Sequence, residues 1–468
     1  MKKKLSIVLL FVICSILVFV GPWPVDETHY SQTDYAKNTF KRIAALRPET
    51  QSGTLLSNAI KINITPPAGV PLGGNAARDP KENTGHIDEV FVRVLSISNG
   101  LHTVSIVSPE ILLPLPELVQ TVVEKTKLQR EEIYFSTTHT HSGPGGYANG
   151  IVAEQTLGSF SKNYFEKLTD KIANAILNSR QSMQASHIKF SRHAISTNYI
   201  NSYMHNQLAD KSTSHNTLNI LEVRNAKNNN RIANLLTLSV HPTILGRTNR
   251  KISGDYPSII MNNLEQDLGG INIFTIGAPG GFTPTTDKIK SSDTNELHKR
   301  NYLGERLSNL IYEAMTTPKD SEELEPKRIK SWKTGSTSIN SKIISIDLPS
   351  SNYRISDSWR LSPYLVKIIF HDESTYIHTL QIGKLFFMSY PADFSGILAK
   401  NIENWGNEND VFPWINSFNG DYIGYIMPSE FEGTDSYIMR DVNFYGPWAG
   451  DYFVESSQKI ILQLNGTQ

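Results

Sequence analysis

The chain almost lacks cysteine. Its one thiol among 468 residues is Cys14, which lies in an apolar run near the N-terminus. The rest of the chain therefore forms no internal disulfide and offers no thiolate to a metal. A metal site there must use histidine, carboxylate or phenol side chains.

The chain also lacks a charge excess, repeats and low-complexity tracts. Lysine plus arginine and aspartate plus glutamate each number 45, so the formal net charge is zero. Without a basic excess, nucleic acid is not an expected partner. A hydrophobic content of 39% is ordinary for a globular protein, and the length allows a sizeable core.

The chain has one continuous apolar run, Leu5 to Val20, and this run is shorter than a typical membrane span. Three lysines precede the run Leu5 to Val20, a pattern of exported segments whose lysines stay in the cytoplasm. We find no small-x-small cleavage site, which favours an uncleaved anchor reaching about Trp23 over a cleaved signal peptide.

These features divide the chain into three parts. We expect a signal-anchor or signal peptide at 1–24, a juxtamembrane segment at 25–56 and a catalytic domain at 57–468. The anchor would make the protein a single-pass cell-membrane protein with its domain outside the cytoplasm; the alternative is a secreted protein.

The domain alternates between strand and helix patterns, which predicts one large mixed α/β domain with a metal site at strand ends. Period-2 and short apolar runs predict strands at 90–95, 103–107, 235–240, 271–276, 342–348, 365–370, 375–382 and 384–389. Helical periodicity predicts helices at 35–46, 115–127, 160–177, 257–268, 298–315, 395–405 and 448–464.

Two histidines follow a predicted buried strand. His139 and His141 come after Ile133-Tyr134-Phe135 and point the same way if the backbone is extended. A glycine- and proline-rich turn follows them at once. The pair suits a metal or catalytic site; the alternative is two polar residues whose partners are backbone groups.

Three further donors have a similar setting. His241 and Asp393 each follow a predicted strand, and Tyr425 lies in a Gly-containing segment. Together with His139 and His141, these nitrogen and oxygen donors suit zinc. The alternatives are an N-cap role for Asp393 ahead of the helix at 395–405 and a packed aromatic role for Tyr425.

Several motifs together resemble one family. They are His139-Thr140-His141-Ser142-Gly143-Pro144-Gly145-Gly146-Tyr147, Ile64-Thr65-Pro66-Pro67 with Pro71-Leu72-Gly73-Gly74, Val240-His241-Pro242, Pro391-Ala392-Asp393-Phe394, Asp421-Tyr422-Ile423-Gly424-Tyr425 and Tyr445-Gly446-Pro447-Trp448. Over roughly residues 57 to 455 the chain resembles the neutral/alkaline non-lysosomal ceramidase family, and the first motif is the most specific match.

The resemblance implies a zinc amidase that cleaves the N-acyl bond of ceramide to give sphingosine and a fatty acid. It implies Zn²⁺ as the cofactor, with His139, His241, Asp393 and Tyr425 as ligands. It places His141 beside the metal, where it binds or polarises a lipid or small amide substrate.

The nucleophile of the family is a serine, and the matching stretch here is Gly280-Gly281-Phe282-Thr283. Thr283 therefore takes the place of the serine; the alternative is a plain turn. Gly280 and Gly281 allow backbone angles that aim N–H groups at a developing oxyanion. Asp255, in the acidic segment after His241, either supports the metal site or caps the next helix.

Four departures mark a divergent member. Asp393 replaces a glutamate, Thr283 replaces the serine, and Asn201 falls nearest to the place of a family arginine. The immunoglobulin-like C-terminal domain of the family is expected to be absent. Two functions of different class follow: a zinc-dependent hydrolase of an N-acyl amide, or a catalytically silent metal-bearing binding protein on the same fold.

Overall fold

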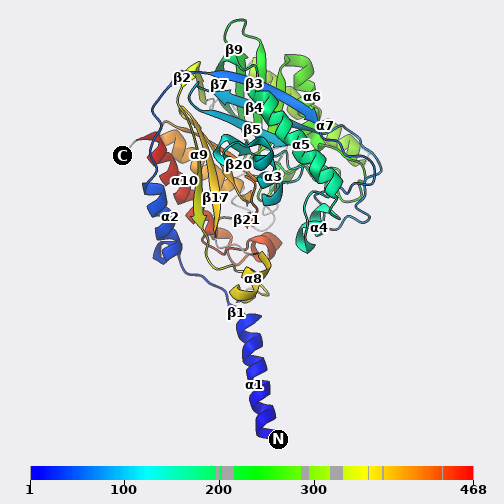
Figure 1. Ribbon diagram of the computed structural model, residues 1–468, viewed down its shortest axis with the longest axis vertical. Helices are drawn as coiled ribbons and strands as arrows, with labels where there is room; N and C mark the ends of the chain where they lie inside the picture. Colours follow the sequence, from blue (N-terminus) through cyan, green and yellow to red (C-terminus); the bar gives the residue numbers. More distant parts are fainter. Residues whose placement is uncertain are drawn as a thin grey trace.

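Two β-sheets packed face to face organise the chain (Figure 1). The computed structural model describes residues 2–196, 200–202, 215–285, 295–316, 330–356, 358–370, 374–434 and 436–466. Helices cover the outer face of each sheet, so the domain has four layers.

The larger sheet has nine strands in the order β11-β10-β9-β7-β3-β4-β5-β6, with β13 paired to β7. It is mixed: the pairs β10–β11 and β5–β6 are parallel and the others antiparallel. Its strands are β3 (Leu56–Asn63), β4 (Phe91–Ser98), β5 (Thr103–Pro109), β6 (Ile133–Phe135), β7 (Gln184–Ala194), β9 (Thr217–Asn225), β10 (Arg231–Leu238), β11 (Ile271–Ile276) and β13 (Lys330–Thr334).

The smaller sheet has the order β15-β17-β18-β20, with β18 and β20 parallel. Its strands are β15 (Ile339–Asp347), β17 (Ser374–Ile382), β18 (Leu385–Tyr390) and β20 (Phe412–Ser417). Buried side chains of both sheets form one apolar cluster between them. Two polar contacts fix the register of the layers: Trp414 Nε1 donates to Thr237 Oγ1 at 2.7 Å, and Tyr134 donates to Asn416 at 3.1 Å.

The outer layers are helical. Helices α3 (Pro116–Thr126), α5 (Lys162–Arg180), α6 (Asp255–Leu268) and α7 (Glu296–Thr316) bury their apolar faces on the larger sheet. Helices α2 (Asp34–Ala44), α9 (Gly396–Glu408) and α10 (Ala449–Asn465) do so on the smaller sheet. Amphipathic helices bury such a stripe because removing apolar area from water stabilises the fold.

Short elements complete the chain. They are α1 (Lys2–Phe19), β1 (Trp23–Pro24), η1 (Tyr30–Gln32), β2 (Gly53–Thr54), η2 (Arg130–Glu132), α4 (Ile151–Leu157), β8 (Ile200–Ser202), β12 (Phe282–Pro284), β14 (Ser336–Thr337), β16 (Trp359–Arg360), α8 (Pro363–Phe370), β19 (Asp393–Phe394), β21 (Tyr425–Ile426), η5 (Ser429–Phe431) and η6 (Ile438–Val442). The pairs β8–β12 and β19–β21 matter most here, because they carry predicted site residues.

The predicted mixed α/β domain is confirmed, with three local corrections. Residues 365–370, predicted as a strand from their β-branched side chains, lie in helix α8, which begins at Pro363. The strand predicted at 235–240 is β10 and is buried on both faces, so its Thr237 is a core residue. Asp393 does not cap α9, because the N-cap is Ser395, whose Oγ accepts from Ile397 N at 3.3 Å.

Residues 25–56, predicted as a separate juxtamembrane segment, contribute α2 to the domain. Helix α2 packs against α10 and β15, and Ala36 and Ile43 are buried in the cluster beneath the smaller sheet. The amphipathic pattern of 35–46 therefore reflects docking on the core.

Helix α1 extends away from the domain (Figure 1). Its apolar side chains are exposed from Leu5 onward. Within the described ranges, no helix combines the length and the apolar content that a membrane span requires. The span predicted over residues 5 to about 23 is therefore not supported.

Candidate metal centre

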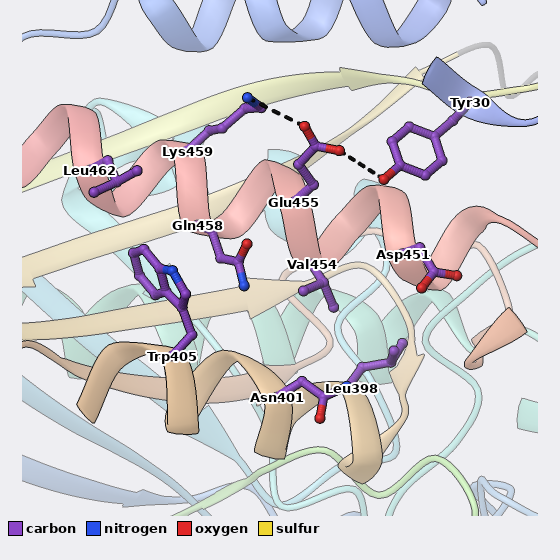
Figure 2. Close-up of a pocket in the computed structure, with 10 residues that line it drawn as sticks. All are labelled: Tyr30, Leu398, Asn401, Trp405, Asp451, Val454, Glu455, Gln458, Lys459 and Leu462. Carbon is purple, nitrogen blue, oxygen red and sulfur yellow. Dashed lines mark hydrogen bonds and ion pairs between the residues drawn. The ribbon is translucent and has the colours of Figure 1, made fainter. Parts of the chain in front are cut away.

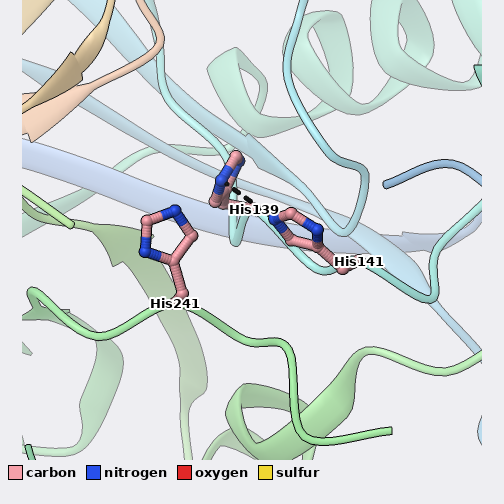
Figure 3. Close-up of side chains that lie close together, drawn as sticks. All are labelled: His139, His141 and His241. Carbon is pink, nitrogen blue, oxygen red and sulfur yellow. Dashed lines mark hydrogen bonds between the residues drawn. The ribbon is translucent and has the colours of Figure 1, made fainter. Parts of the chain in front are cut away.

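Three imidazoles from two strand ends meet in one place (Figure 3). His139 lies four residues beyond the end of β6, and His241 lies three beyond the end of β10. Donor atoms of His139, His141 and His241 all lie within 4.8 Å of one another. His139 and His241 are buried and His141 is partly exposed, so the set has a closed side and an accessible side.

A carboxylate joins the imidazoles. Asp393 Oδ1 lies 3.0 Å from His241 Nε2 and 3.7 Å from His139 Nε2, while His141 Nε2 lies 3.3 Å from His139 Nε2. Tetrahedral zinc with bonds of about 2.0–2.1 Å separates its ligand atoms by about 3.3–3.4 Å. The observed separations bracket that value. We name His139, His141, His241 and Asp393 the histidine site.

Backbone carbonyls fix the tautomers of the two buried rings. His139 Nδ1 lies 2.7 Å from Leu112 O, and His241 Nδ1 lies 2.8 Å from Phe282 O. A carbonyl oxygen only accepts, so each Nδ1 carries the proton and donates. The Nε2 atom of each ring is then the one directed toward Asp393. This is the way outer partners orient metal-binding histidines.

The electrostatics keep the His139 and His141 rings neutral. Burial, with the nearby His141 and His241, holds the pKa of His139 well below its usual range. Burial, then His241, lowers the pKa of His141 to about 3. Neutral imidazole is the form that binds a metal. Two lone pairs and a carboxylate oxygen crowded together repel one another unless a cation lies between them, so the donor set fits a metal ion.

The backbone conformation around His139 and His141 brings the imidazoles together. His139 has a φ of +61°, which turns the chain sharply after the strand, and its ring stacks on Phe418 with centroids 4.1 Å apart. Two hydrogen bonds fix the backbone of His141. Its N–H donates to Pro242 O at 3.1 Å, and its carbonyl accepts from Arg78 Nη2 at 2.8 Å.

Asp393 and Tyr425 lie on neighbouring strands. Strand β19 pairs in parallel with β21, and the register sets Asp393 opposite Tyr425. The Tyr422 hydroxyl donates to Asp393 Oδ2 at 3.0 Å. Burial and the Asp393 charge hold the pKa of Tyr422 well above its usual range. Sequence reasoning missed Tyr422, although it lies in the same motif as Tyr425.

The glycine turn and Thr283 also belong to this region. Gly280 N donates to Phe394 O at 2.9 Å, and a side chain on Gly280 would lie 2.6 Å from Asp393 O. Gly280 is thus required for close approach to the Asp393 segment. Gly281 has a φ of +92°, which favours glycine. In the β8–β12 pair Thr283 lies opposite Asn201, so the two predicted residues are brought together.

Asp255 supports the loop that follows His241. Its carboxylate accepts from Leu245 N at 3.2 Å and from Tyr256 N at 2.7 Å. Burial raises the pKa of Asp255 to about 6. Asp255 is the first residue of α6, whose N-cap is Gly254, so its role is bracing the loop.

A second histidine cluster lies behind the first and was not predicted. His215 Nδ1 is 2.6 Å from Ser239 Oγ, and His215 Nε2 is 3.1 Å from Glu403 Oε2. Arg192 lies 3.5 Å from Glu403 Oε1, and Thr217 donates to Oε2 at 3.0 Å. We name Ser239, His215 and Glu403 the buried cluster, because all three are at most 3% exposed.

A cleft of about 520 Å³ lies away from both clusters, between α9 and α10 (Figure 2). Trp405 and Leu398 line one side. On the other, Glu455 accepts from Tyr30 at 2.7 Å and pairs with Lys459 at 3.3 Å. None of the predicted site residues lines this cleft, and the Glu455 contacts join η1 to α10.

Fold and site together define a mixed α/β protein with a candidate histidine–carboxylate metal centre beyond the ends of its strands. Residues 75–278 match the family model described as neutral/alkaline non-lysosomal ceramidase, N-terminal. Neutral ceramidase B of Dictyostelium discoideum is 27% identical over 170 residues, which cover 34% of this chain and 23% of that protein. A neutral ceramidase of Mycobacterium tuberculosis is 25% identical over 205 residues, which cover 37% of this chain and 31% of that protein.

The fold agrees with these matches. The crystal structure of neutral ceramidase from Pseudomonas aeruginosa superposes with a TM-score of 0.71 at 16% identity, covering 88% of this chain and 74% of that chain. These matches support the neutral/alkaline non-lysosomal ceramidase family that the motifs predicted, and the family model covers less than half of the chain. The matched part spans only about a quarter to a third of the length of these two curated relatives.

Proposed function

We propose that this protein is a zinc-dependent hydrolase that cleaves the N-acyl amide bond of a ceramide-like lipid or a related amide. The observation that carries the proposal is the histidine site. Two buried imidazoles with fixed tautomers and one carboxylate place three donor atoms 3.0 to 3.7 Å from their neighbours. The similarity to neutral ceramidases supports the choice of reaction class.

In this proposal His139, His241 and Asp393 hold the metal, and Tyr425 is the fourth ligand that the family resemblance implies. When bound, zinc would supply a Lewis acid for an amide carbonyl and a water whose pKa falls to about 7. His141 is the partly exposed member of the set. Its neutral ring is suited to hydrogen-bond the substrate at the open side.

Thr283 is the candidate nucleophile. It is partly exposed and follows Phe282, whose carbonyl accepts from both the ring and the backbone N–H of His241. A hydroxyl there lies next to the segment that orients a metal ligand. Thr283→Ala should abolish turnover and leave the metal content unchanged; unchanged turnover would assign the attack to a water instead.

A silent metal-bearing binding protein is the second candidate, favoured by the missing family arginine near Asn201 and by the threonine at position 283. The deciding experiment uses the purified full chain, with metal analysis and a panel of ceramide, other N-acyl amides and simple esters. We expect about one zinc per chain, weak turnover of ordinary ceramide and faster turnover of another amide or ester. Loss of turnover with a chelator and its recovery with zinc would support the hydrolase, whereas bound zinc without turnover of any substrate would support the binding protein.

We further propose that the domain lies outside the cytoplasm. The three lysines ahead of the apolar run support export with the N-terminus retained inside. Terminal sequencing of protein from native membranes and from the medium tests this. A mature start near residue 25 in the medium would indicate a secreted form, and recovery only from the cytoplasm would contradict export.

A further inference from the structure

Arg78 is a buried cation beside the histidine site, and it lies outside the motifs that carry the family resemblance. The residue is 2% exposed, and burial lowers its pKa to about 10, so the guanidinium stays charged near neutral pH. Within the described ranges of the chain no carboxylate pairs with it, and its Nε atom has no hydrogen-bond partner. Burying a charge without a counter-charge destabilises the fold, so the contacts of its other donors must offset that cost.

The guanidinium bridges three loops through their main-chain carbonyls. Its Nη1 donates to Gly73 O at 3.0 Å, and its Nη2 donates to His141 O at 2.8 Å and to Gly246 O at 3.2 Å. His141 lies in the loop after β6, and Gly246 lies in the loop after β10 that carries His241. One nitrogen atom of Arg78 therefore joins the two loops from which the imidazoles of the histidine site come (Figure 3).

Two neighbouring contacts show how closely these loops pack. His141 N donates to Pro242 O at 3.1 Å, which ties the start of one loop to the start of the other. A side chain on Gly74 would lie 2.4 Å from the Cα atom of His141, so the segment before Arg78 packs directly on the histidine loop. The Arg78 bridge to Gly246 adds a link at the far end of the His241 loop.

Arg78 can influence the site only through these loops. It is almost fully buried, and both of its terminal nitrogens are bonded to carbonyls, so it has no free face for a substrate. The donor atoms of the three histidines lie within 4.8 Å of one another, and a metal site tolerates displacements of only about 0.5 Å. The planar fork of arginine holds two carbonyls in fixed directions, whereas a lysine ammonium is a point charge on a flexible stem.

We propose that Arg78 is a positioning residue that fixes the spacing between the His141 loop and the His241 loop, and that it thereby sets the geometry and the affinity of the metal site. The inference rests on the metal centre of the proposed function and adds a residue outside the ligand set. This role requires the fork of the guanidinium, and its charge alone does not fulfil it.

The test compares two buried arginines by titrating the metal-free full chain with cobalt, a spectroscopic substitute for zinc. Arg78→Lys keeps the charge and removes the fork. Arg360→Lys is the matched control: Arg360 in β16 is 6% exposed, and its guanidinium also donates to main-chain carbonyls, those of Pro24, Ser350 and Ser351. The visible absorption of cobalt reports affinity and ligand geometry without any substrate. Chemical denaturation gives the free energy of unfolding of each variant.

A second variant, Arg78→Gln, removes the fork and the charge together. It leaves no unpaired charge in the interior, so it provides the folded comparison if Arg78→Lys does not fold. We expect wild type and Arg360→Lys to bind cobalt with the same affinity and the same visible spectrum. Both Arg78 variants should bind cobalt about 10–100-fold more weakly and with an altered spectrum.

Wild-type affinity and spectrum in Arg78→Lys overturn the inference, even if Arg78→Gln binds weakly, because the charge and not the fork would then matter. Equal losses of affinity in Arg78→Lys and Arg360→Lys also overturn it, because they indicate a general loosening of the fold. If the wild type itself binds no cobalt, the metal centre of the proposed function fails and the inference fails with it. Normal wild-type binding without an effect at Arg78 removes the inference alone.

Discussion

The histidine site and the buried cluster each place histidine beside a carboxylate, but they differ in what the ring nitrogens contact. In the buried cluster, His215 has a partner on each nitrogen: Ser239 Oγ at one and the Glu403 carboxylate at the other. In the histidine site, His139 and His241 each use Nδ1 on a carbonyl and turn Nε2 toward Asp393. A serine, a histidine and a carboxylate in contact have the connectivity of a catalytic triad, but a serine that is sealed from solvent cannot reach a substrate.

The comparison shows what a candidate site requires. Ser239 is 0% exposed, and its hydroxyl also accepts from Ala278 N at 2.8 Å. The buried cluster thus ties the end of β10 to α9, behind His241 and Asp393. The histidine site, with its partly exposed His141, keeps donor atoms for a ligand. One cluster should govern stability and the other metal binding.

The largest expected effect is on stability, from Glu403→Gln. The change leaves the Arg192 guanidinium buried without its carboxylate, and breaking a buried ion pair costs about 3–5 kcal/mol. Chemical denaturation of the apoprotein measures the free energy of unfolding. The matched control is Glu408→Gln on the exposed end of the same helix, expected within about 0.5 kcal/mol of wild type. Equal stability of the two variants would contradict the role assigned to the buried cluster.

Next in size is the loss of zinc from His241→Ala. Removing an outer partner of a ligand weakens metal binding about 10–100-fold, so removing the ligand itself should cost more than about 100-fold. Competition titration with a chromophoric chelator gives the affinity. His215→Gln is the comparison: it should lower stability and keep zinc. If His241→Ala retained stoichiometric zinc, or if His215→Gln lost it, the division between the clusters would be wrong.

A smaller effect is expected from Tyr422→Phe. Its hydroxyl donates to Asp393 Oδ2, so the variant frees one carboxylate oxygen and should weaken zinc binding about 10–100-fold. The same titration on Tyr425→Phe sharpens the assignment. A larger loss in Tyr425→Phe would fit the ligand role taken from the family resemblance, whereas no loss in either variant would remove both tyrosines from the metal centre.

Much of the fold could be predicted because its signals are local. The buried strand before His139 and the helix over residues 162–180 follow from periodicity alone. The wrong strand prediction at 365–370 also has a local cause. Val366 and Ile368 favour strands, but Pro363 begins helix α8, and the exposed face of this helix makes few packing contacts that could indicate its structure. Propensity therefore gave the wrong element where the tertiary structure covers the chain least.

The site was predictable to the extent that residue types sufficed. His139, His241 and Asp393 were expected together, and their donor atoms do meet. The buried cluster was not, because Ser239 and Glu403 lie 24 and 188 residues from His215, and only the tertiary fold brings these segments together. Tyr422 was missed for a different reason: the sequence alone does not show that its hydroxyl reaches the Asp393 carboxylate, because that contact depends on the turn before β21.

The smallest expected effect near neutral pH is on the free energy of unfolding of the apoprotein. Its dependence on pH distinguishes the histidine site from the buried cluster. In the folded state, burial and the nearby His241 lower the pKa of His141 to about 3. As the pH falls, the unfolded chain therefore binds a proton at this residue before the folded chain does, which lowers the free energy of unfolding. The His141 contribution is complete above about pH 6.5 and declines toward pH 3. Although burial opposes ionisation, Arg192 and His215 lower the pKa of Glu403 to about 2. Its contribution is therefore complete above its usual pKa of 4.5 and declines as pH falls toward 2.

The two windows overlap only below about pH 4.5, which lets one experiment distinguish the clusters. We expect His141→Gln to flatten the decline of unfolding free energy between pH 6.5 and 4.5, by at most about 1.4 kcal/mol per pH unit for one proton. Glu403→Gln should leave that window unchanged in slope and flatten only the region below it. Denaturant titrations of both variants and wild type in chelator, at half-unit pH steps, give the slopes. A change of slope above pH 4.5 in Glu403→Gln would mean that the two clusters titrate as one network, because the proton equilibria would then be coupled through the segment from Ser239 to His241.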